Sequence, residues 1–340
     1  MLTAEYDTLS EIEVPSCAIR CIVLCLLFGV ATTSHSRAQS VEVSGLGYLD
    51  YFYNLSSPTE SEENVHGFTY RRLYLTTDFT LSDRFKGRAR LEANEGTSGQ
   101  NGPVPFVKDL YLTWTYTGSH SATFGVTPPP AFETAENVWG YRSLEKTILD
   151  FQGIVDSRDF GIRIDGPITS GGLFRYAAML ANNSASRTET DAYKRAYVHL
   201  SAHPTDNVVL SIGGDRAGYG DDRTDATRLS GFGGLVFDHI RVGLEGFWSR
   251  VTMEDDNEFS HTGLSLFGSV RITRQWEVVA RVDRAKEERS GVDLLETFVL
   301  AGVSYQPNEF VQLIPNLWVD TIDGADKAEA TARFTVFLSF

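Results

Sequence analysis

Charged side chains recur at every second position in several segments of this 340-residue sequence. In the segment 88–94, Arg88, Arg90 and Glu92 alternate with small or aliphatic residues. Because successive side chains of a β-strand point to opposite faces, such a segment carries all its charges on one face. Rows of guanidinium and carboxylate groups can attract and orient ions, but they do not form a nucleophile with its base. The pattern therefore predicts a wet, ion-attracting surface and no catalytic residue.

The expected polar face extends over neighbouring segments. On the lipid side at mid-bilayer, each arginine would cost about 2–4 kcal/mol, so we expect these side chains to line a water-filled interior. Strict alternation also places Phe68 and Tyr70 on the face of Arg72. The expected pore-lining residues are Arg72, Arg88, Arg90, Asp109 and Arg163, and the same face is expected to hold Asp78, Glu92, Asp159, Asp165, Arg195, Glu245, Glu277 and Arg281.

The elements that would position these charges are sixteen alternating segments, which begin at 41–54, include 85–94 and 275–285, and end at 327–340. A polar loop is expected at 286–292. Each segment has about the 9–11 residues that a tilted strand needs to cross a bilayer, and tight turns alternate with longer polar loops. The last segment places Phe334, Val336 and Phe340 on one face. These features predict an all-β fold, a transmembrane antiparallel barrel of about 16 strands enclosing water. For the last segment alone, the edge strand of a soluble sandwich is the alternative.

The longest connection, 128–156, begins with three prolines. A loop of this length in a compact protein usually has a function. Its charged residues are Glu133, Arg142, Glu145, Lys146 and Asp150. We expect it to fold into the barrel as a constriction loop, with an extracellular flap as the alternative.

The first 38 residues are predicted to be a cleaved secretory signal, and 39–340 to be the barrel domain. An apolar stretch too short to span a bilayer precedes the small residues Ser36 and Ala38. All three cysteines, Cys17, Cys21 and Cys25, lie in this leader. Its two basic and four acidic residues would leave a mature chain of charge −13 in place of −15. So acidic a chain argues against nucleic-acid binding.

Other chemical sites are disfavoured, and no cofactor or metal is expected. The glycines at 231–234 are not followed by a helical pattern, which argues against a nucleotide loop. His199 and His203 lack further ligands at metal spacing. Acidic loop residues could bind Ca²⁺ or Mg²⁺ loosely, although a solvated surface explains them as well. No Gly-x-Ser-x-Gly motif occurs, but a Ser-His-Asp site could still assemble in space.

Three segments resemble the phosphate-selective porins (O and P type) of Gram-negative outer membranes. They read FGVTPPPAF at 124–132, RSLEK at 142–146 and SRDFGIRI at 157–164. In that family a strand ending in a proline run enters the constriction loop, and the chain leaves it through an Arg-Asp-x-Gly-x-Arg strand. The local match spans about 68–183. The family's phosphate-specific members have a dense ladder of basic residues, whereas the interior expected here mixes arginines with carboxylates.

The resemblance implies an outer-membrane porin, a homotrimer, that passes small hydrophilic or anionic solutes or ions and contacts membrane lipid and lipopolysaccharide. Charge at a constriction sets ion preference at close range. Because arginines on neighbouring strands would cluster there, we expect a weak anion preference. A barrel enzyme acting on lipids and a secreted soluble β-protein are the alternatives.

Overall fold

The computed structural model describes residues 40–99, 102–255, 257–289 and 291–340. The predicted signal, 1–38, lies outside these residues. The strands are β1 (Ser40–Ser56), β2 (His66–Thr80), β3 (Phe85–Asn94), β4 (Ser98–Gly99), β5 (Gly102–Pro103), β6 (Phe106–Thr117), β7 (His120–Thr127), β8 (Asp159–Pro167), β9 (Phe174–Ala181), β10 (Arg195–Thr205), β11 (Val208–Gly218), β12 (Arg223–Val236), β13 (Ile240–Met253), β14 (Glu258–Arg271), β15 (Trp276–Arg289), β16 (Val292–Asn308), β17 (Val311–Ile322) and β18 (Glu329–Ser339). The helices are η1 (Glu60–Glu62), η2 (Glu95–Thr97), α2 (Glu133–Trp139) and α3 (Ile148–Phe151).

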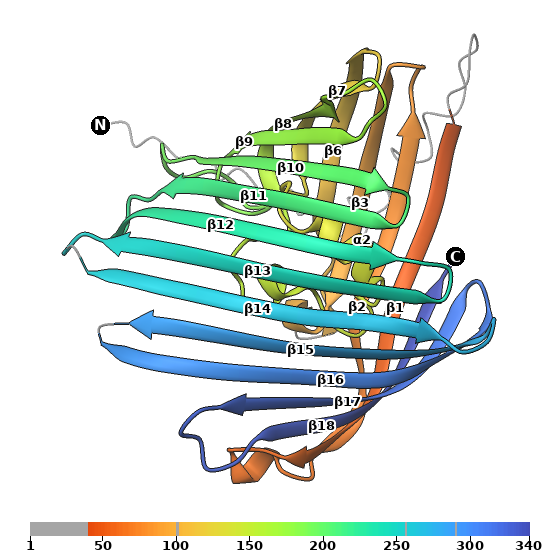
Figure 1. Ribbon diagram of the computed structural model, residues 1–340, viewed down its shortest axis with the longest axis vertical. Helices are drawn as coiled ribbons and strands as arrows, with labels where there is room; N and C mark the ends of the chain where they lie inside the picture. Colours follow the sequence, from red (N-terminus) through yellow and green to blue (C-terminus); the bar gives the residue numbers. More distant parts are fainter. Residues whose placement is uncertain (1–39, 100–101, 256, 290) are drawn as a thin grey trace, which may run out of the picture. The chain divides into compact units, whose positions relative to one another are not determined.

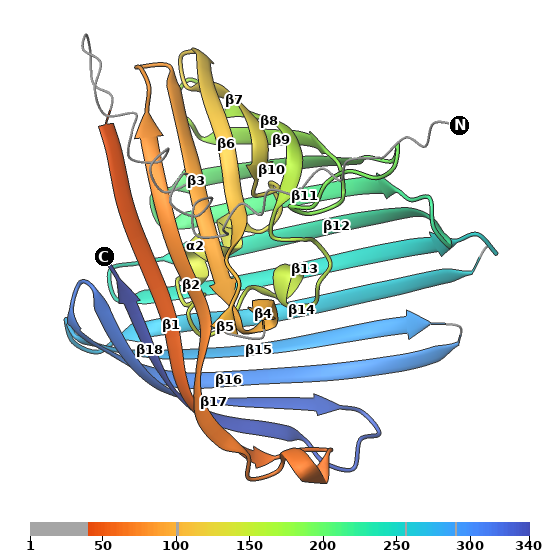
Figure 2. The ribbon, with the colours of Figure 1, turned by 180° about the vertical axis from the view of Figure 1, so that it is seen from behind.

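Sixteen strands form one closed antiparallel barrel, while β4 and β5 pair separately. The first and last barrel strands complete the ring, with Leu46 opposite Ser339 and Tyr53 opposite Ala332. The backbone N–H of Gly45 donates to the carbonyl oxygen of Phe340, and the N–H of Phe340 donates to the carbonyl oxygen of Gly45. Figures 1 and 2 show the long strands β12–β16 on one side of the barrel and β1, β2, β3 and β6 on the other. The predicted fold class is confirmed.

Side chains alternate between the outside and the inside of the barrel. On β15, Val278 and Val282 are 43% and 41% exposed, whereas Val279 and Arg281 between them are 0% and 2% exposed. On β18, Phe334 is exposed and Thr335 is buried, as the alternation predicts. The outer surface is therefore apolar and the inner surface carries most of the strand charges.

Strand ends follow the sequence prediction closely. The predicted segment 85–94 coincides with β3. β15 is longer than predicted: it continues through Lys286 to Arg289 and pairs with β16, where the sequence suggested a loop at 286–292. Lys286 there forms ion pairs with Glu288 and Asp293, and these pairs stabilise the extension of the hairpin.

Among the register shifts of the barrel, two β-bulges bring additional charged residues to the inside. Tyr48 on β1 pairs with Arg72 and the next residue, Leu49, pairs with Tyr70, so Arg71 is the extra residue of β2. The prediction that Phe68 shares the face of Arg72 is wrong: Phe68 is 89% exposed on the outside. An inserted residue moves each side chain beyond it in the strand to the opposite face of the sheet.

The second bulge lies in β6, where Arg90 pairs with Asp109 and Leu91 pairs with Val107. Lys108 is therefore the extra residue. Lys108 and Asp109 are both buried on the inside. Each bulge thus points two consecutive charged residues, Arg71–Arg72 and Lys108–Asp109, into the barrel.

Candidate functional site

The connection from β7 to β8 runs inside the barrel and carries α2 and α3. Three prolines, Pro128–Pro130, cannot donate to a strand ladder and end β7. Gly140, in the left-handed conformation (φ 67°), ends α2 directly after the buried Trp139. In both ribbon views α2 lies between the wall of β12–β14 and the opposite strands (Figures 1 and 2). We call 128–158 the inner loop.

The inner loop packs against the wall through apolar contacts. Trp139 is 1% exposed, and its ring centroid lies 5.2 Å from that of Phe267 on β14. Leu144 joins the same cluster with Phe298 and Leu300 of β16. Because these wall residues point inward, the loop packs on the β12–β17 wall inside the barrel. A cavity of about 520 Å³ remains between the loop and β11–β15.

Arginines of the wall anchor the loop backbone. A loop leaves backbone carbonyls without ladder partners, and each buried carbonyl needs a donor. Arg71 donates to the carbonyl oxygens of Ser143 and Leu144, and Arg281 donates to that of Lys146. Further anchors run from Arg195 to Ile154 (3.2 Å) and from Arg163 to Pro128 (3.2 Å).

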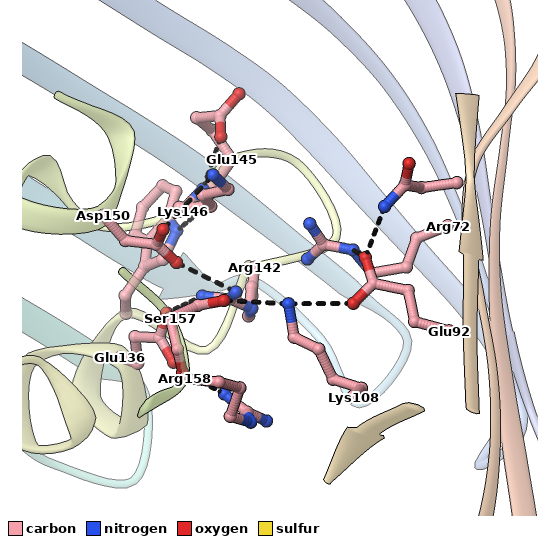
Figure 3. A network of polar contacts seen from close by, with 12 residues as sticks. Arg72, Glu92, Lys108, Glu136, Arg142, Glu145, Lys146, Asp150, Ser157 and Arg158 are labelled. Atoms are coloured by element: carbon pink, nitrogen blue, oxygen red, sulfur yellow. Dashed lines mark hydrogen bonds and ion pairs between the residues drawn. The ribbon is translucent and has the colours of Figure 1, made fainter. Parts of the chain in front are cut away.

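A cavity of about 460 Å³ remains between the inner loop and β1–β3. Tyr48 and Arg72 line it from the wall, and Arg142, Lys146 and Phe151 line it from the loop. Figure 3 shows Arg72, Glu92 and Lys108 on one side and the charged loop residues on the other. Charged groups of the wall and the loop line this cavity, and we call it, with the ion pairs around it, the constriction.

Each of four carboxylates at the constriction is shared by two cations. Glu92 lies 3.3 Å from Nε of Arg72 and 2.9 Å from Nζ of Lys108. Asp150 lies 2.9 Å from Arg142 and 3.2 Å from Lys146. The remaining pairings are Asp109 with Arg90 (3.4 Å) and Arg158, and Asp50 with Arg71 and Arg333 (3.8 Å).

The acidic and the basic side chains of these clusters differ in their exposure to water. The side chains of the four carboxylates are 0–5% exposed, whereas those of their eight cations are 11–34% exposed. The acids therefore lie behind the bases. An ion that approaches any of these four carboxylates meets their guanidinium or ammonium partners first.

The total charge of the constriction is nearly balanced. Three further acids lie around it: Glu136 pairs with Arg142, and Glu95 and Glu145 line the cavity. Eight cations thus face seven carboxylates. The positive character comes from the arrangement of the charges more than from their number.

Two loop groups have displaced pKa values. Burial would raise the pKa of Asp150, but the neighbouring Arg142 and Lys146 outweigh burial and hold that pKa below its usual value. Burial, together with the carboxylate of Glu277, raises the pKa of Tyr141 to about 12. Asp150 is therefore ionised and Tyr141 neutral at ordinary pH.

The expected pore-lining residues all have side chains on the inside, in three places. Arg72 and Arg90 approach the ring of Tyr74 at 5.7 and 4.8 Å and, with Asp109, belong to the constriction. Arg88 lies further along β3 and pairs with Asp78 at 2.6 Å. Arg163 lies on β8 under the start of the inner loop, 2.9 Å from Glu133.

The expected loop residues divide in the same way. Arg142, Lys146 and Asp150 meet at the constriction, and Glu145 lines its cavity. Glu133 is turned toward β8 instead. Asp150 is 5% exposed and is held between its two partners, so of these three side chains the two basic ones are the more exposed.

Alternation alone missed Arg71, Lys108, Arg158 and Asp50. The signal for the bulges was available: two consecutive charged residues, Arg71–Arg72 or Lys108–Asp109, cannot both face water in a regular strand of this barrel. Arg158 follows α3, and only the folded loop brings it to Asp109.

Among the described residues, no group of His, Cys, Asp and Glu is arranged to hold a metal ion. No helix within the described ranges is long and apolar enough to cross a membrane.

Comparisons with known proteins identify the fold. No protein-family model and no curated protein sequence matches the chain. Among solved structures, the anion-selective porin from Comamonas acidovorans is similar, with a TM-score of 0.67 at 13% identity over 89% of this chain and 100% of that one. OmpT, an outer membrane protein of Vibrio cholerae in its trimer form, gives 0.67 at 12% over 89% and 100%. Salmonella typhi OmpF in complex with daunomycin gives 0.66 at 10% over 89% and 98%. The chain thus has the barrel fold of outer-membrane porins.

Proposed function

We propose that this protein is an outer-membrane porin, a diffusion channel for small hydrophilic solutes with a weak preference for anions. The observation that carries the proposal is the arrangement of charge at the constriction, where four buried carboxylates each hold two more exposed cations. Screening acts over about 8 Å in physiological salt, so charges at a narrow passage act on each ion that crosses it. The proposal requires no catalytic residue.

A general anion preference is supported better than phosphate specificity. The sequence resembles phosphate-selective porins, but every cation of the constriction has a carboxylate partner. A phosphate dianion would have to compete with those partners for each guanidinium. Chloride and small carboxylates need not displace these partners, because the weak, long-range attraction of the cations is enough for a general anion preference.

A homotrimer is part of the proposal. The strands β7, β8 and β9 have only 8, 9 and 8 residues, at or below the length that a tilted strand needs to span a bilayer. In a trimer, contact with the other copies would cover the part of the barrel wall that these short strands form. The similar OmpT structure bears the description "trimer form".

Single-channel recording of the purified protein in a planar bilayer tests the proposal. Stable conductance steps with a reversal potential on the anion side are expected. The absence of steps would contradict the channel. Recovery of the protein in a soluble fraction, or phospholipid hydrolysis in detergent micelles, would favour the secreted or the enzymatic alternative.

A further inference from the structure

The cavity of about 520 Å³ between the inner loop and β11–β15 has a wall of two chemically different rows. Cross-strand pairing aligns the first, which we call the polar row: Asp215, Arg228, Ser249, His261 and Glu287. The next inward row toward the longer loops, the apolar row, contains Ala226, Val251 and Phe259 and ends at Arg289. The strands β12–β14 thus present hydrogen-bonding groups at one level and apolar side chains at the next.

Arg228 is a buried cation whose charge is only partly compensated. Its side chain is 2% exposed, and its Nη2 pairs with Asp215, which already holds Arg195 at 2.6 Å. Glu245 acts on Arg228 through space, but among the described residues no ion pair joins the two. The Nε and Nη1 groups of Arg228 find no hydrogen-bond acceptor in the same part of the chain. Two guanidinium groups thus share one directly paired carboxylate, and the surplus charge would stabilise a further anion nearby.

Ser249 and His261 bring hydrogen-bond donors to the cavity beside Arg228. Ser249 lies opposite Arg228, His261 lies opposite Ser249, and both line the cavity. Within the described ranges, neither side chain has a hydrogen-bond partner. A hydroxyl and a ring N–H can both donate to a carboxylate, and hydrogen bonds to an ionised acceptor are stronger than those to a neutral one.

The charges that line the cavity are more basic than acidic. They are the cations Arg195, Arg223, Arg228 and Arg289 and the acids Asp215 and Glu287. Arg223 has its own partner, Asp221, at 2.6 Å. Glu287 lies opposite His261 at the β15 end of the polar row, so we expect an anion to lie on the β12–β13 side of His261.

We propose that this cavity binds a small monocarboxylate with an apolar body. The carboxylate accepts hydrogen bonds from Ser249 and His261 and is attracted by the buried charge of Arg228, while the body lies against the apolar row. The cavity has the volume of ordinary small-molecule sites, about 300–1,000 Å³. An inorganic anion would leave the apolar row in contact with water, and a neutral solute would leave the surplus charge uncompensated. The inference deepens the proposed function, on which it rests for the route by which the solute reaches the cavity.

Isothermal titration calorimetry of the full chain in detergent tests this site, with benzoate as the probe and empty micelles as the blank. Arg228→Gln should weaken benzoate binding at least about tenfold, because it removes a charge close to the carboxylate in a region of low dielectric constant. Ala226→Leu keeps every charge and fills the space beside the apolar row, so it should abolish benzoate binding. Arg274→Gln, in the turn between β14 and β15 at the opposite end of these strands, removes one arginine and should leave binding unchanged. Acetate, which has the same charge without the ring, should bind wild type more weakly than benzoate.

Wild-type protein that takes up no more benzoate than empty micelles would overturn the proposal. Unchanged benzoate affinity in Arg228→Gln or in Ala226→Leu would also overturn it. If acetate or inorganic phosphate binds as tightly as benzoate, the cavity is a simple anion site and the proposal is wrong. The acetate and Ala226→Leu measurements decide the matter even if Arg228→Gln does not fold.

Conductance is recorded separately on the same protein. Benzoate binding that depends on Arg228 in a protein that forms no channel would leave the site standing and contradict the proposed function. A conducting channel that binds no benzoate would do the reverse.

Discussion

Arg281 on β15 donates from its guanidinium to the carbonyl oxygen of Lys146 in the inner loop. The same guanidinium pairs with Asp283, and both side chains are buried, at 0% and 1% exposure. One residue thus joins the wall, a buried acid and the backbone of the loop next to a cation of the constriction. This contact ties the inner loop to the β15 wall.

Arg281→Gln should therefore loosen the loop. Removing one member of a buried ion pair leaves the other uncompensated, which typically costs about 3–5 kcal/mol. We expect a lower unfolding temperature, noisier single-channel current and faster protease cleavage within 140–150. Arg271→Gln, an exposed neighbour of Glu277, is the matched control. An Arg281→Gln channel as quiet and as stable as wild type would contradict the anchoring role.

Deleting residues 131–150 should raise the conductance, because the segment occupies part of the barrel interior, where it packs on the β12–β17 wall. The barrel ladder does not depend on this segment, so the folded barrel should still resist protease in the membrane. Single-channel conductance and proteolysis are measured on the same preparation. An intact barrel with unchanged conductance would show that the loop does not narrow the passage.

Arg72→Gln combined with Arg90→Gln should abolish the anion preference. The change leaves six cations against seven carboxylates at the constriction and uncovers Glu92 and Asp109. Arg88→Gln is the control, because Arg88 has its own partner, Asp78, outside the constriction. The reversal potential in a KCl gradient should move from the anion side to about zero for the double variant only. The same shift in the control would mean that the general interior charge, and not the constriction, sets the preference.

Asp150 gives the constriction a defined pH dependence. Its pKa is held below the usual value, so the ion pairs it makes are complete above that usual value and are lost only as the pH falls through the lowered pKa. Asp150→Asn should be more anion-selective than wild type at pH 7, since it removes one of seven acids. This difference should be almost complete even at about pH 4, where an ordinary aspartate is already half protonated, and should vanish only at lower pH. A difference that has already fallen to half at about pH 4 would contradict the lowered pKa.

The alternation of residues along each segment was enough to predict the barrel. The candidate site depends on contacts between residues far apart in the chain. The extent of β3 and the facing of Thr335 and Phe334 follow from alternation, which is a local property. The contact of Trp139 with Phe267 joins residues far apart in the chain, and no local spacing reports it. Arg71 shows the limit most clearly, because one inserted residue exchanges the two faces of β2.

The central claim is that exposed cations backed by buried carboxylates give the passage a weak anion preference in a chain of net charge −15. The reversal potential of the wild-type channel across a KCl gradient at pH 7 tests it most directly. The account predicts a modest potential of the sign that reports faster passage of chloride. A potential of the opposite sign, reporting preference for potassium, would contradict it.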